Sequence, residues 1–529
     1  MKKKAFYITT PIYYPSGHPH IGHAYCTTLC DILARYKRML HIDTFFLTGT
    51  DEHGLKIEKN AALANKTPLE FVDEIATNFK KLWKALEITN DDFIRTTEKR
   101  HHEVVQYVFS EMLAKGDIYL GSYNGWYCTP CESFWTDTQV GEEHLCPDCG
   151  RKVEMASEEA YFFRLQNYLE PLLKLFEEDK FIEPESRKNE MLNTFIKPGL
   201  EDLCVSRTSF SWGIPVKEDN KHIVYVWVDA LFNYLTALNY HTSDDSLYQK
   251  FWANEDSEIV HVVGADITRF HTIYWPEFLM SMGLRVPNRV FVHGLLMMKD
   301  GKMSKSKGNV ISPFPLIEKY GVDTVRYYLA REVIFGQNGQ FTPEQFVERT
   351  NMDLANNYGN LVSRTISMII KYFDGVIPSF KEGVLPLDKE LEILTKNTIS
   401  AYQSKMDNLE VTEALMEVEE LLNAANKYIE DSTPWVLAKD ETKLNELASV
   451  MAHLSYIIYV STKLLSPVIV NKTSDVFEML GINNEESDFN NITNVNILNN
   501  KKVSKKDVLF PRLDVKEEVE YIKSLMPNK

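Results

Sequence analysis

Residues 5–40 read AFYITTPIYYPSGHPHIGHAYCTTLCDILARYKRML. The stretch begins with an apolar, β-prone run from Ala5 to Tyr14, turns through proline and glycine, and continues from Ala24 to Leu40 with helical periodicity. This order predicts a strand, a turn and a helix, the unit from which parallel sheets are built. His20 and His23 stand at the predicted start of the helix, where backbone N–H groups and the helix dipole favour phosphate.

A second string, Lys302-Met303-Ser304-Lys305-Ser306, follows an apolar run at 289–298 and a turn at 299–301. Two lysines separated by small hydroxyl residues suit a polyanion whose charge grows during a reaction. Each string alone has a plainer interpretation, as a surface turn with histidines or as a solvated loop with lysines. Together, and in this order, they indicate a site for a nucleoside triphosphate.

The composition is that of a large enzyme with an ample core. The chain has 529 residues, of which 44% are hydrophobic, and its formal net charge is −17. No long uncharged apolar span occurs, so we expect no membrane contact and a cytoplasmic location. The negative charge does not favour nucleic acid, so a nucleic-acid partner would have to bind a local basic face in a salt-sensitive way.

Four of the seven cysteines form two pairs, Cys128-x2-Cys131 and Cys146-x2-Cys149, with proline and glycine around them. Such paired knuckles place four thiolates around one zinc ion, with no open position for a substrate. The sequence therefore predicts one structural Zn²⁺. The alternative is four separate buried cysteines. Cys26, Cys30 and Cys204 lack such partners, and Cys26 and Cys30, one helical turn apart, are most simply packing residues.

Strand and helix patterns alternate in two parts of the chain. We expect strands at Thr44–Thr48, Ile223–Val228 and Ile259–Gly264, the last two as apolar strands of a buried parallel sheet, and helices from Thr67 to Leu86 and from Glu98 to Lys115. Beyond about residue 343 the pattern is helical. These observations predict an α/β fold with a doubly wound, Rossmann-like parallel sheet, interrupted by the zinc-knuckle insertion and followed by an α-helical bundle.

The two polar strings resemble the HIGH and KMSKS motifs of class I aminoacyl-tRNA synthetases. From residue 6 to about 514 the chain resembles the methionyl-tRNA synthetase family. The matching stretches, in chain order, are Pro11-Ile12-Tyr13-Tyr14, Gly49-Thr50-Asp51-Glu52-His53-Gly54, Tyr225-Val226-Trp227-Val228-Asp229-Ala230, Gly264-Ala265-Asp266-Ile267 through His271, Asn360 to Arg364, and Pro434-Trp435.

The resemblance implies a methionine–tRNA ligase that activates methionine with ATP and then transfers it to the 3′ end of its tRNA. It implies ATP, Mg²⁺ beside the triphosphate, and contacts with both the acceptor end and the anticodon of the tRNA. The patterns of strands, turns and helices, together with this resemblance, divide the chain into six segments. These are the first half of the catalytic nucleotide-binding domain (1–115), the connective insertion with the zinc knuckle (116–216), the second half of the catalytic domain (217–312), a linker after the lysine string (313–342), an α-helical anticodon-binding domain (343–515) and a C-terminal tail (516–529).

For methionine, the resemblance implies a pocket whose aromatic faces suit a flexible, polarizable thioether. Asp51 would accept hydrogen bonds from the substrate ammonium. Without the resemblance, Trp227 and Tyr234 are more simply interpreted as core residues. The implied methionine-binding residues are Pro11, Ile12, Tyr14, Asp51, Trp227, Ala230, Tyr234, Ile267 and His271.

For ATP, the resemblance assigns His20 and His23 to the phosphates, Gly22 to the close approach of adenine, and Gly264 and Asp266 to the ribose. Lys302 and Lys305 would clamp the triphosphate. The implied catalytic residues are His20, His23, Asp51, Lys302 and Lys305. Arg207 lies near the active site in the family, although a surface arginine explains it equally well.

For the anticodon, the resemblance points to Asn360, Arg364 and Trp435. Asn360 and Arg364 are four residues apart, hence on one helix face, and Trp435 follows a proline at a predicted helix start. An amide, a guanidinium and an indole suit hydrogen bonding to, and stacking on, unpaired bases. The alternative is a solvated helix face beside a core tryptophan.

Three other functions fit the sequence less well. Cysteinyl-tRNA synthetases use a catalytic zinc with dispersed ligands, which Cys26 and Cys30 do not provide. A synthetase-like tRNA-binding protein with a decayed site would show damage to the histidines, to Asp51 or to the lysines, and all are intact. A zinc-ribbon binding protein leaves the α/β segments unexplained. Because the chain carries one set of knuckles and ends soon after the helical region, we expect a single zinc and a monomer.

Overall fold

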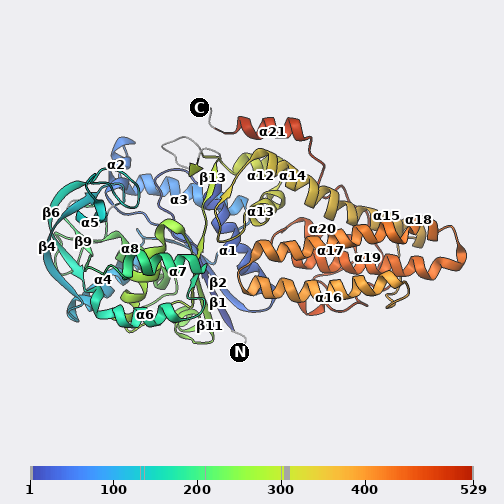
Figure 1. Ribbon diagram of the computed structural model, residues 1–529, viewed down its shortest axis with the longest axis horizontal. Coiled ribbons are helices and arrows are strands. Elements are labelled where there is room, and N and C mark those ends of the chain that lie inside the picture. The colour runs from blue at the N-terminus through green and yellow to red at the C-terminus, as the bar shows by residue number, and fades with distance from the viewer. Residues whose placement is uncertain are drawn as a thin grey trace. The chain divides into compact units, whose positions relative to one another are not determined.

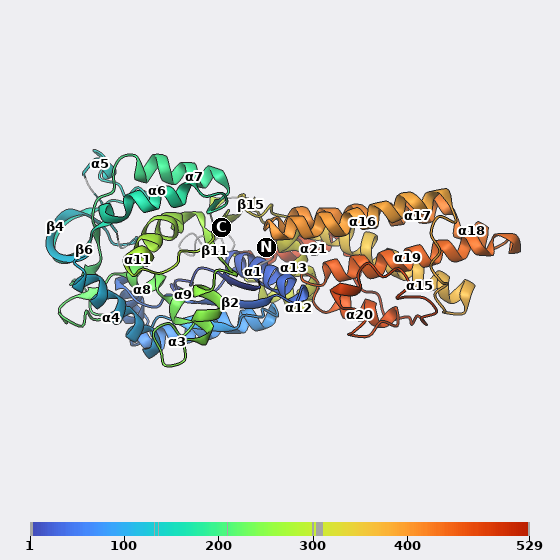
Figure 2. The ribbon, with the colours of Figure 1, turned by 90° about the horizontal axis from the view of Figure 1, so that it is seen from below.

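The computed structural model describes residues 4–131, 133–135, 137–208, 210–298 and 310–526, together with the backbone of Gly301–Lys302. It divides into two compact units, coloured by residue number in Figures 1 and 2. The first unit comprises Met1–Pro19, Ile42–Trp83 and Thr89–Gly294. The second comprises His20–His41, Lys84–Ile88 and Leu295–Lys529.

The first unit is built on a six-stranded parallel sheet with strand order β3-β2-β1-β11-β12-β7. The strands are β1 (Ala5–Thr9), β2 (Asp43–Thr50), β3 (Asp92–Arg95), β7 (Ile182–Glu183), β11 (Ser257–Gly264) and β12 (Arg289–His293). The order reverses between β1 and β11, and at such a switch point ligands bind beyond the carboxyl ends of the strands. The predicted doubly wound sheet is thereby confirmed.

The strands predicted at Thr44–Thr48 and Ile259–Gly264 and the two predicted helices of this unit agree with the structure to within two residues. β1 is buried along its whole length, which explains its continuous apolar run. The predicted helices are α3 (Pro68–Ala85) and α4 (Lys99–Ala114). Before α3, the Glu70 carboxylate accepts from the backbone N–H of Thr67, and the Thr67 hydroxyl accepts from the N–H of Glu70. This reciprocal cap is why the helix begins where it does.

The strand predicted at Ile223–Val228 is wrong. Only β10 (Ile223–Val224) is extended there, and it pairs antiparallel with β9 (Ser206–Arg207) outside the parallel sheet. The chain then enters the short helix α8 (Val226–Leu231), nearly all of whose residues are buried. A helix buried on every side has the same continuous apolar run as a buried strand, so periodicity cannot separate the two.

The insertion forms an antiparallel sheet of its own, with strand order β5-β4-β6-β8. Its strands are β4 (Ile118–Cys128), β5 (Ser133–Trp135), β6 (Glu154–Phe163) and β8 (Leu203–Cys204). Helices α6 (Leu169–Glu177) and α7 (Glu185–Met191) follow β6 in the chain. Antiparallel pairing allows short connections, and the cysteine knuckles lie in the turns after β4 and before β6.

In the second unit, α1 (Ile21–Met39) is the helix predicted after the first strand. A small sheet with strand order β14-β13-β15 is formed by β13 (Leu296–Met298), β14 (Gly301–Lys302) and β15 (Gly339–Gln340). The rest of this unit is mainly helical, and in it α16, α17 and α19 lie side by side (Figures 1 and 2). The helices of that part are α12 (Phe314–Tyr320), α13 (Val322–Arg331), α14 (Pro343–Arg349), α15 (Asn360–Phe373), α16 (Pro386–Asp407), α17 (Val411–Ser432), α18 (Pro434–Leu437), α19 (Leu444–Leu465), α20 (Lys472–Met479) and α21 (Val515–Ser524). The predicted helical region is confirmed.

A buried ion pair fixes α1 within the second unit. Arg326 of α13 lies 2.7 Å from the Asp31 carboxylate of α1, and both side chains are fully buried. The same guanidinium donates to the carbonyl oxygens of Leu86, Pro467 and Val468. Removing either member of the pair would leave a buried charge without its counterion, so the pair is costly to break. It therefore holds α1 firmly against the segment that joins α19 to α20.

Among the residues that the structure describes, no helix has both the length and the apolar composition that crossing a bilayer requires.

One core carboxyl group lacks the partner that burial normally demands. Glu277 of α11 (Trp275–Ser281) is fully buried, and within the described part of the chain neither of its side-chain oxygens has a hydrogen-bond partner. Burial raises the pKa of Glu277 to about 9, so the group is neutral at pH 7. A neutral carboxyl group avoids most of the cost of an unpaired buried charge.

Glu277 gives the protein a predictable pH dependence of stability. Because its pKa rises on folding, the stabilisation is present below the ordinary value of 4.5 and is lost as pH rises through about 9. We expect the neutral isostere Glu277→Gln to melt about 5 °C higher than the wild type at pH 9, with a smaller difference at pH 5. Thermal melts across that range test this; parallel curves for the two proteins would contradict it.

Candidate active site

His20 and His23 lie at the start of α1 and cap it. The backbone N–H of Gly22 donates to Nδ1 of His20, and the N–H of His20 donates to Nδ1 of His23. Because both Nδ1 atoms accept, the proton of each neutral ring must sit on Nε2. The ring centroids are 3.9 Å apart, so both Nε2–H groups belong to one cluster at the positive end of the helix dipole. Such an array suits phosphate oxygens.

Gly22 lies in a confined position against the imidazole of His20. A Cβ built on Gly22 would lie 3.0 Å from a ring carbon of His20, so any side chain there would push that ring away. The lysine string is only partly described. Gly301–Lys302 forms strand β14, paired with β13 (Leu296–Met298), and Lys305 lies outside the described residues.

Asp51 comes directly after β2, at the carboxyl edge of the parallel sheet. Its backbone N–H donates to the carbonyl of Tyr13, which itself bridges to Thr50, so the segments after β1 and β2 are tied together. Asp51 is 8% exposed. The segment Pro11, Ile12 and Tyr14 therefore lies along the same edge as this carboxylate.

The next residue, Glu52, has a structural role. Its carboxylate accepts from the hydroxyls of Thr50 and Thr97 and from Nε of Arg95. All of these partners come from β2, from β3 or from the residues just after β3. Glu52 is therefore fully hydrogen-bonded within the protein and holds the end of β2 in place.

A buried network fixes α8. The Asp229 carboxylate accepts from Nδ1 of His53 at 2.7 Å and from Nε2 of His101 at 2.9 Å. Burial alone would raise the pKa of Asp229, but the two imidazoles outweigh it and hold the pKa well below that of an ordinary carboxyl group. Since Asp229 shares α8 with Trp227 and Ala230, this contact positions both of them relative to the segment after β2.

Trp227 is stacked on Phe270, a residue that the sequence did not assign. The ring centroids are 3.5 Å apart and the planes are inclined by 8°. Nε1 of Trp227 is buried and has no hydrogen-bond partner within the described part of the chain. In the sequence, Phe270 could have been identified only from its position next to His271, in a stretch that matches the family.

Tyr234, Ile267 and His271 are joined by hydrogen bonds. Nδ1 of His271 lies 3.0 Å from the Ile267 carbonyl, and Nε2 lies 2.8 Å from the Tyr234 hydroxyl. A carbonyl only accepts, so the proton sits on Nδ1 and the tyrosine donates to Nε2. Burial lowers the pKa of His271 to about 4, so the ring is neutral at pH 7. The site therefore offers an uncharged, aromatic surface.

Gly264 and Asp266 meet at the end of β11. A Cβ built on Gly264 would lie 2.7 Å from Oδ1 of Asp266, so a side chain there would displace the carboxylate. Both residues stand at the sheet edge where a ligand is expected. Arg207 is buried rather than on the surface, since it is 1% exposed.

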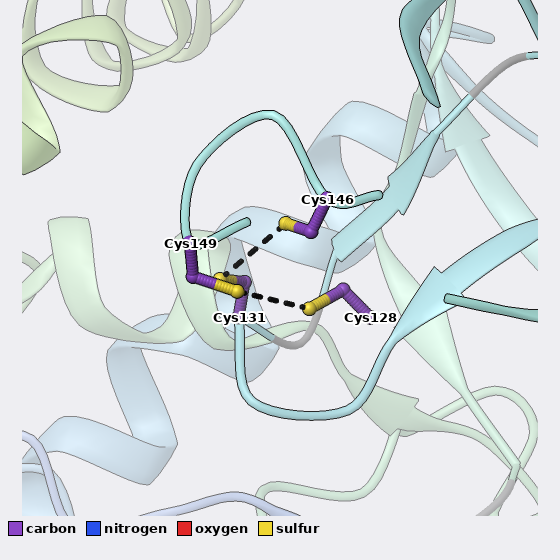
Figure 3. Close-up of side chains that lie close together, drawn as sticks. All are labelled: Cys128, Cys131, Cys146 and Cys149. Atoms are coloured by element: carbon purple, nitrogen blue, oxygen red, sulfur yellow. Dashed lines mark hydrogen bonds between the residues drawn. The ribbon is translucent and has the colours of Figure 1, made fainter. Parts of the chain in front are cut away.

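The four knuckle cysteines converge (Figure 3). Their sulfur atoms lie within 4.8 Å of one another, and the Cys128–Cys149 and Cys131–Cys146 pairs are 3.6 and 3.7 Å apart. Sulfur ligands about 2.3 Å from a tetrahedral zinc ion lie about 3.8 Å from each other. The donor set and its spacing therefore fit a zinc ion.

The residues assigned to the anticodon lie in the second unit. Asn360 and Arg364 share a face of α15, and Arg364 donates to Glu430 of α17 at 2.7 Å. Trp435 follows the proline that begins α18 and is 38% exposed. An indole this exposed can be contacted by a binding partner. Arg364, in contrast, must release Glu430 before its guanidinium can bind another group.

The candidate residues for methionine, ATP and the anticodon are divided between the two units. The methionine-pocket residues and Gly264 with Asp266 belong to the first unit, and Ile12, Trp227 and Ile267 pack against its core. His20, Gly22 and His23 belong to the second unit, as do the three anticodon residues. Their roles in binding and catalysis stay predictions.

Two family models match the chain. The model described as tRNA synthetases class I (M) matches residues 6–157 and 145–366. The model described as the anticodon binding domain of methionyl tRNA ligase matches residues 382–526. Together they cover most of the sequence.

Curated proteins and solved structures agree with these models. Methionine–tRNA ligase of Bacillus subtilis (strain 168) is 54% identical over 99% of this chain and 80% of its own length, and that of Clostridium tetani is 50% identical over 99% and 81%. A crystal structure of Mycobacterium tuberculosis methionyl-tRNA synthetase bound by methionyl-adenylate superposes with a TM-score of 0.91 at 38% identity, covering 96% of this chain and all of the other. Its apo form has a TM-score of 0.85 at 35% identity, covering 97% and 99%.

Proposed function

Because the chain belongs to the methionyl-tRNA synthetase family of class I aminoacyl-tRNA synthetases, we propose how its own residues divide the two steps of that reaction. The protein is an ATP-dependent methionine–tRNA ligase. It activates L-methionine with ATP to methionyl-adenylate and pyrophosphate, and then transfers methionine to the 3′ end of its tRNA.

Methionine binds between the aromatic residues of α8 and those after β11. The observation that supports this most directly is that Phe270, which stacks on Trp227, and His271, which pairs with Tyr234, are adjacent residues of one turn. An uncharged aromatic surface suits a thioether, and the near-buried Asp51 is a counterion for the ammonium. Pro11, Ile12, Tyr14, Ala230 and Ile267 complete the proposed wall.

ATP binds through its phosphates to His20 and His23 and through its ribose to Gly264 and Asp266. The Nε2–H groups and the start of α1 stabilise the charge that develops as the methionine carboxylate attacks the α-phosphorus. Gly22 admits the adenine, and Lys302 and Lys305 hold the departing pyrophosphate. Mg²⁺ beside the triphosphate supplies further charge neutralisation. No enzyme nucleophile is needed.

The same proposal assigns the six predicted segments to the two halves of the catalytic domain, the knuckle insertion, the linker, the anticodon-binding helices and the tail. Asn360, Arg364 and Trp435 read the anticodon by hydrogen bonding and stacking. The exposed indole of Trp435 supports this role. We also propose a monomer that works in the cytoplasm, which sedimentation and cell fractionation would test.

The assignment is tested by exchange of labelled pyrophosphate into ATP. We expect exchange that depends on methionine, is absent with leucine or cysteine, and proceeds without tRNA. Folded protein that exchanges without regard to the amino acid would contradict the proposed pocket.

Zinc binding follows from the cysteine cluster and gives a separate prediction. Cys128, Cys131, Cys146 and Cys149 would hold one ion that fastens the two knuckles together and takes no part in the reaction. We expect one zinc per chain by elemental analysis. Cys146→Ser should lose most of this zinc and lower the melting temperature, whereas Cys204→Ser, which changes a buried cysteine outside the cluster, should keep it. Equal zinc content in the two variants would exclude the site.

A further inference from the structure

His261 is a fully buried polar residue within the apolar run of β11. A polar ring is costly to bury unless its nitrogens are hydrogen-bonded. The indole N–H of Trp275 donates to Nε2 of His261 at 3.1 Å, and Nδ1 lies 2.8 Å from the Thr9 hydroxyl. An indole N–H only donates, so the proton of the neutral imidazole sits on Nδ1 and is donated to Thr9. Both nitrogens are therefore satisfied, and the ring is held in one orientation.

The imidazole of His261 carries no charge at pH 7. Burial, followed by the nearby His271, lowers the pKa of His261 well below its ordinary value. A neutral ring can pack against a second ring without burying an unpaired charge. The surface that the Tyr234–His271 pair offers to a thioether thus rests on an uncharged ring.

His261 covers one face of the Tyr234 ring. The two ring centroids are 4.1 Å apart, with the planes inclined by 27°, whereas those of His271 and Trp275 lie 5.8 and 5.9 Å from Tyr234. The Tyr234 carbonyl accepts from the Tyr7 hydroxyl, and the Tyr234 hydroxyl donates to Nε2 of His271. Hydrogen bonds therefore fix the two ends of the tyrosine, and the closest ring contact, with His261, sets the plane of its ring.

The hydrogen-bond partners of His261 stand next to other segments that are assigned to methionine. Thr9, the last residue of β1, is the neighbour of His261 in the parallel register and comes just before residues 11–14. Trp275 begins α11, directly after the turn that carries His271. All of these residues belong to the first unit. One side chain thus connects the end of β1, the start of α11 and the ring of Tyr234.

We propose that His261 is a positioning residue of the methionine site, which holds the Tyr234 ring in the orientation that the substrate side chain requires. It acts through Tyr234 and not by contact with the substrate. The inference rests on the proposed function, because it assumes that Tyr234 contacts methionine. A ring that is fixed before the substrate arrives need not be ordered during binding, so the loss of His261 should weaken methionine binding in particular.

The first test removes the ring and keeps one hydrogen bond. In His261→Asn the side-chain amide can still donate to Thr9, and in His261→Gln the side-chain carbonyl can still accept from Trp275. Because neither variant has a ring, we expect both to raise the KM for methionine about five- to tenfold, the worth of an aromatic pair. The KM for ATP and the kcat of pyrophosphate exchange should stay within about twofold to threefold of the wild type. Two ringless variants keep the inference testable if one of them does not fold.

His261→Phe makes the opposite exchange. It keeps a ring against Tyr234 and removes both hydrogen bonds, which deprives Trp275 and Thr9 of their buried partner. We therefore expect a lower melting temperature than that of the wild type, but a KM for methionine within about twofold of it. A purely structural role predicts instead that the KM follows the loss of stability in all three variants, and that result would overturn the inference.

The matched control is His222→Asn. His222 is another fully buried histidine of the first unit; its Nδ1 lies 2.9 Å from the Ser206 hydroxyl, and its ring centroid lies 5.0 Å from that of Tyr161. Neither of these neighbours is assigned to methionine. We expect the variant to melt at a lower temperature and to keep a KM for methionine within about twofold of the wild type. A rise as large as that of His261→Asn would mean that the loss of any buried histidine weakens the site.

A double-mutant cycle tests whether His261 acts through Tyr234. Tyr234→Ala removes the ring that His261 is proposed to hold, and it should itself raise the KM for methionine. In that background His261→Asn should add less than about twofold, because the two side chains work as a unit. Calorimetric titration of the full-length, zinc-loaded proteins with methionine should give the same pattern in Kd. Equal factors in both backgrounds would mean that His261 acts by another route and would overturn the inference.

The outcomes separate this inference from the proposed function. If the wild type shows no methionine-dependent exchange, or if Tyr234→Ala leaves the KM for methionine unchanged, the proposed function or its pocket fails and the inference falls with it. If Tyr234→Ala raises that KM but His261→Asn and His261→Gln do not, only the role of His261 is wrong and the rest of the assignment stands.

Discussion

Replacing His23 with alanine is expected to slow methionine-dependent pyrophosphate exchange by about 10²- to 10³-fold and to leave the KM for methionine within about twofold of its wild-type value. The imidazole Nε2–H is proposed to act on the triphosphate, whose charge grows only as the reaction proceeds. An interaction that strengthens in the transition state lowers turnover when it is removed, and it scarcely changes the affinity for the other substrate.

The effect of His23→Ala on stability must be separated from its effect on catalysis. Nδ1 of His23 accepts from the backbone N–H of His20, so alanine also removes a helix cap, at a cost of about 1 kcal/mol of stability. Glutamine at this third helical position can accept the same N–H through its side-chain carbonyl. We therefore expect His23→Gln to melt like the wild type and still to lose most of its activity.

The control for His23 is His18→Ala. His18 is an exposed histidine of the same segment that lies 3.1 Å from the Asn78 amide nitrogen and has no assigned role. Its replacement should leave exchange within about twofold of wild type, as for surface substitutions in general. Should His23→Ala raise the KM for methionine and leave the adenylation rate unchanged, the phosphate assignment would be wrong.

The sheet, the knuckles and the bundle were predictable because each rests on a local pattern. Buried parallel strands are continuous apolar runs, helices repeat every three to four residues, and two C-x2-C pairs define a metal site by spacing alone. The failure at Ile223–Val228 has the same origin. That run ends in α8, a helix buried on all sides, so its sequence lacks the polar face that distinguishes a helix from a strand.

The contacts that were not predictable join residues far apart in the chain. Asp229 meets His53 and His101 across 176 and 128 positions, and no spacing rule relates them. The stack of Phe270 on Trp227 is set by how α8 and the turn after β11 pack together. A sequence motif names the residues at a site, whereas the neighbours that orient them are known only from the packed structure.

Replacing Asp51 with asparagine is expected to raise the KM for methionine by about 10²-fold, because a near-buried carboxylate facing an ammonium contributes on the order of 3 kcal/mol. The KM for ATP should change little, since Asp51 is assigned to the amino acid alone. Steady-state exchange with each substrate varied in turn measures both constants. The neighbouring Glu52→Gln is the matched comparison. Its carboxylate is already held by Thr50, Arg95 and Thr97, so that variant should lose thermal stability more than methionine affinity.

A methionine analogue without the amino group gives a decisive test of the role assigned to Asp51. 4-(Methylthio)butanoic acid keeps the thioether and the carboxylate of methionine but cannot pair with Asp51. In the wild type it should inhibit far more weakly than methionine binds, because the Asp51 carboxylate loses its ammonium partner. In Asp51→Asn that difference should shrink from about 10²-fold to less than about tenfold, since the amide gains little from the ammonium. If both proteins discriminate equally between the two compounds, another group must bind the ammonium, and the edge after β2 would not be the amino-acid site.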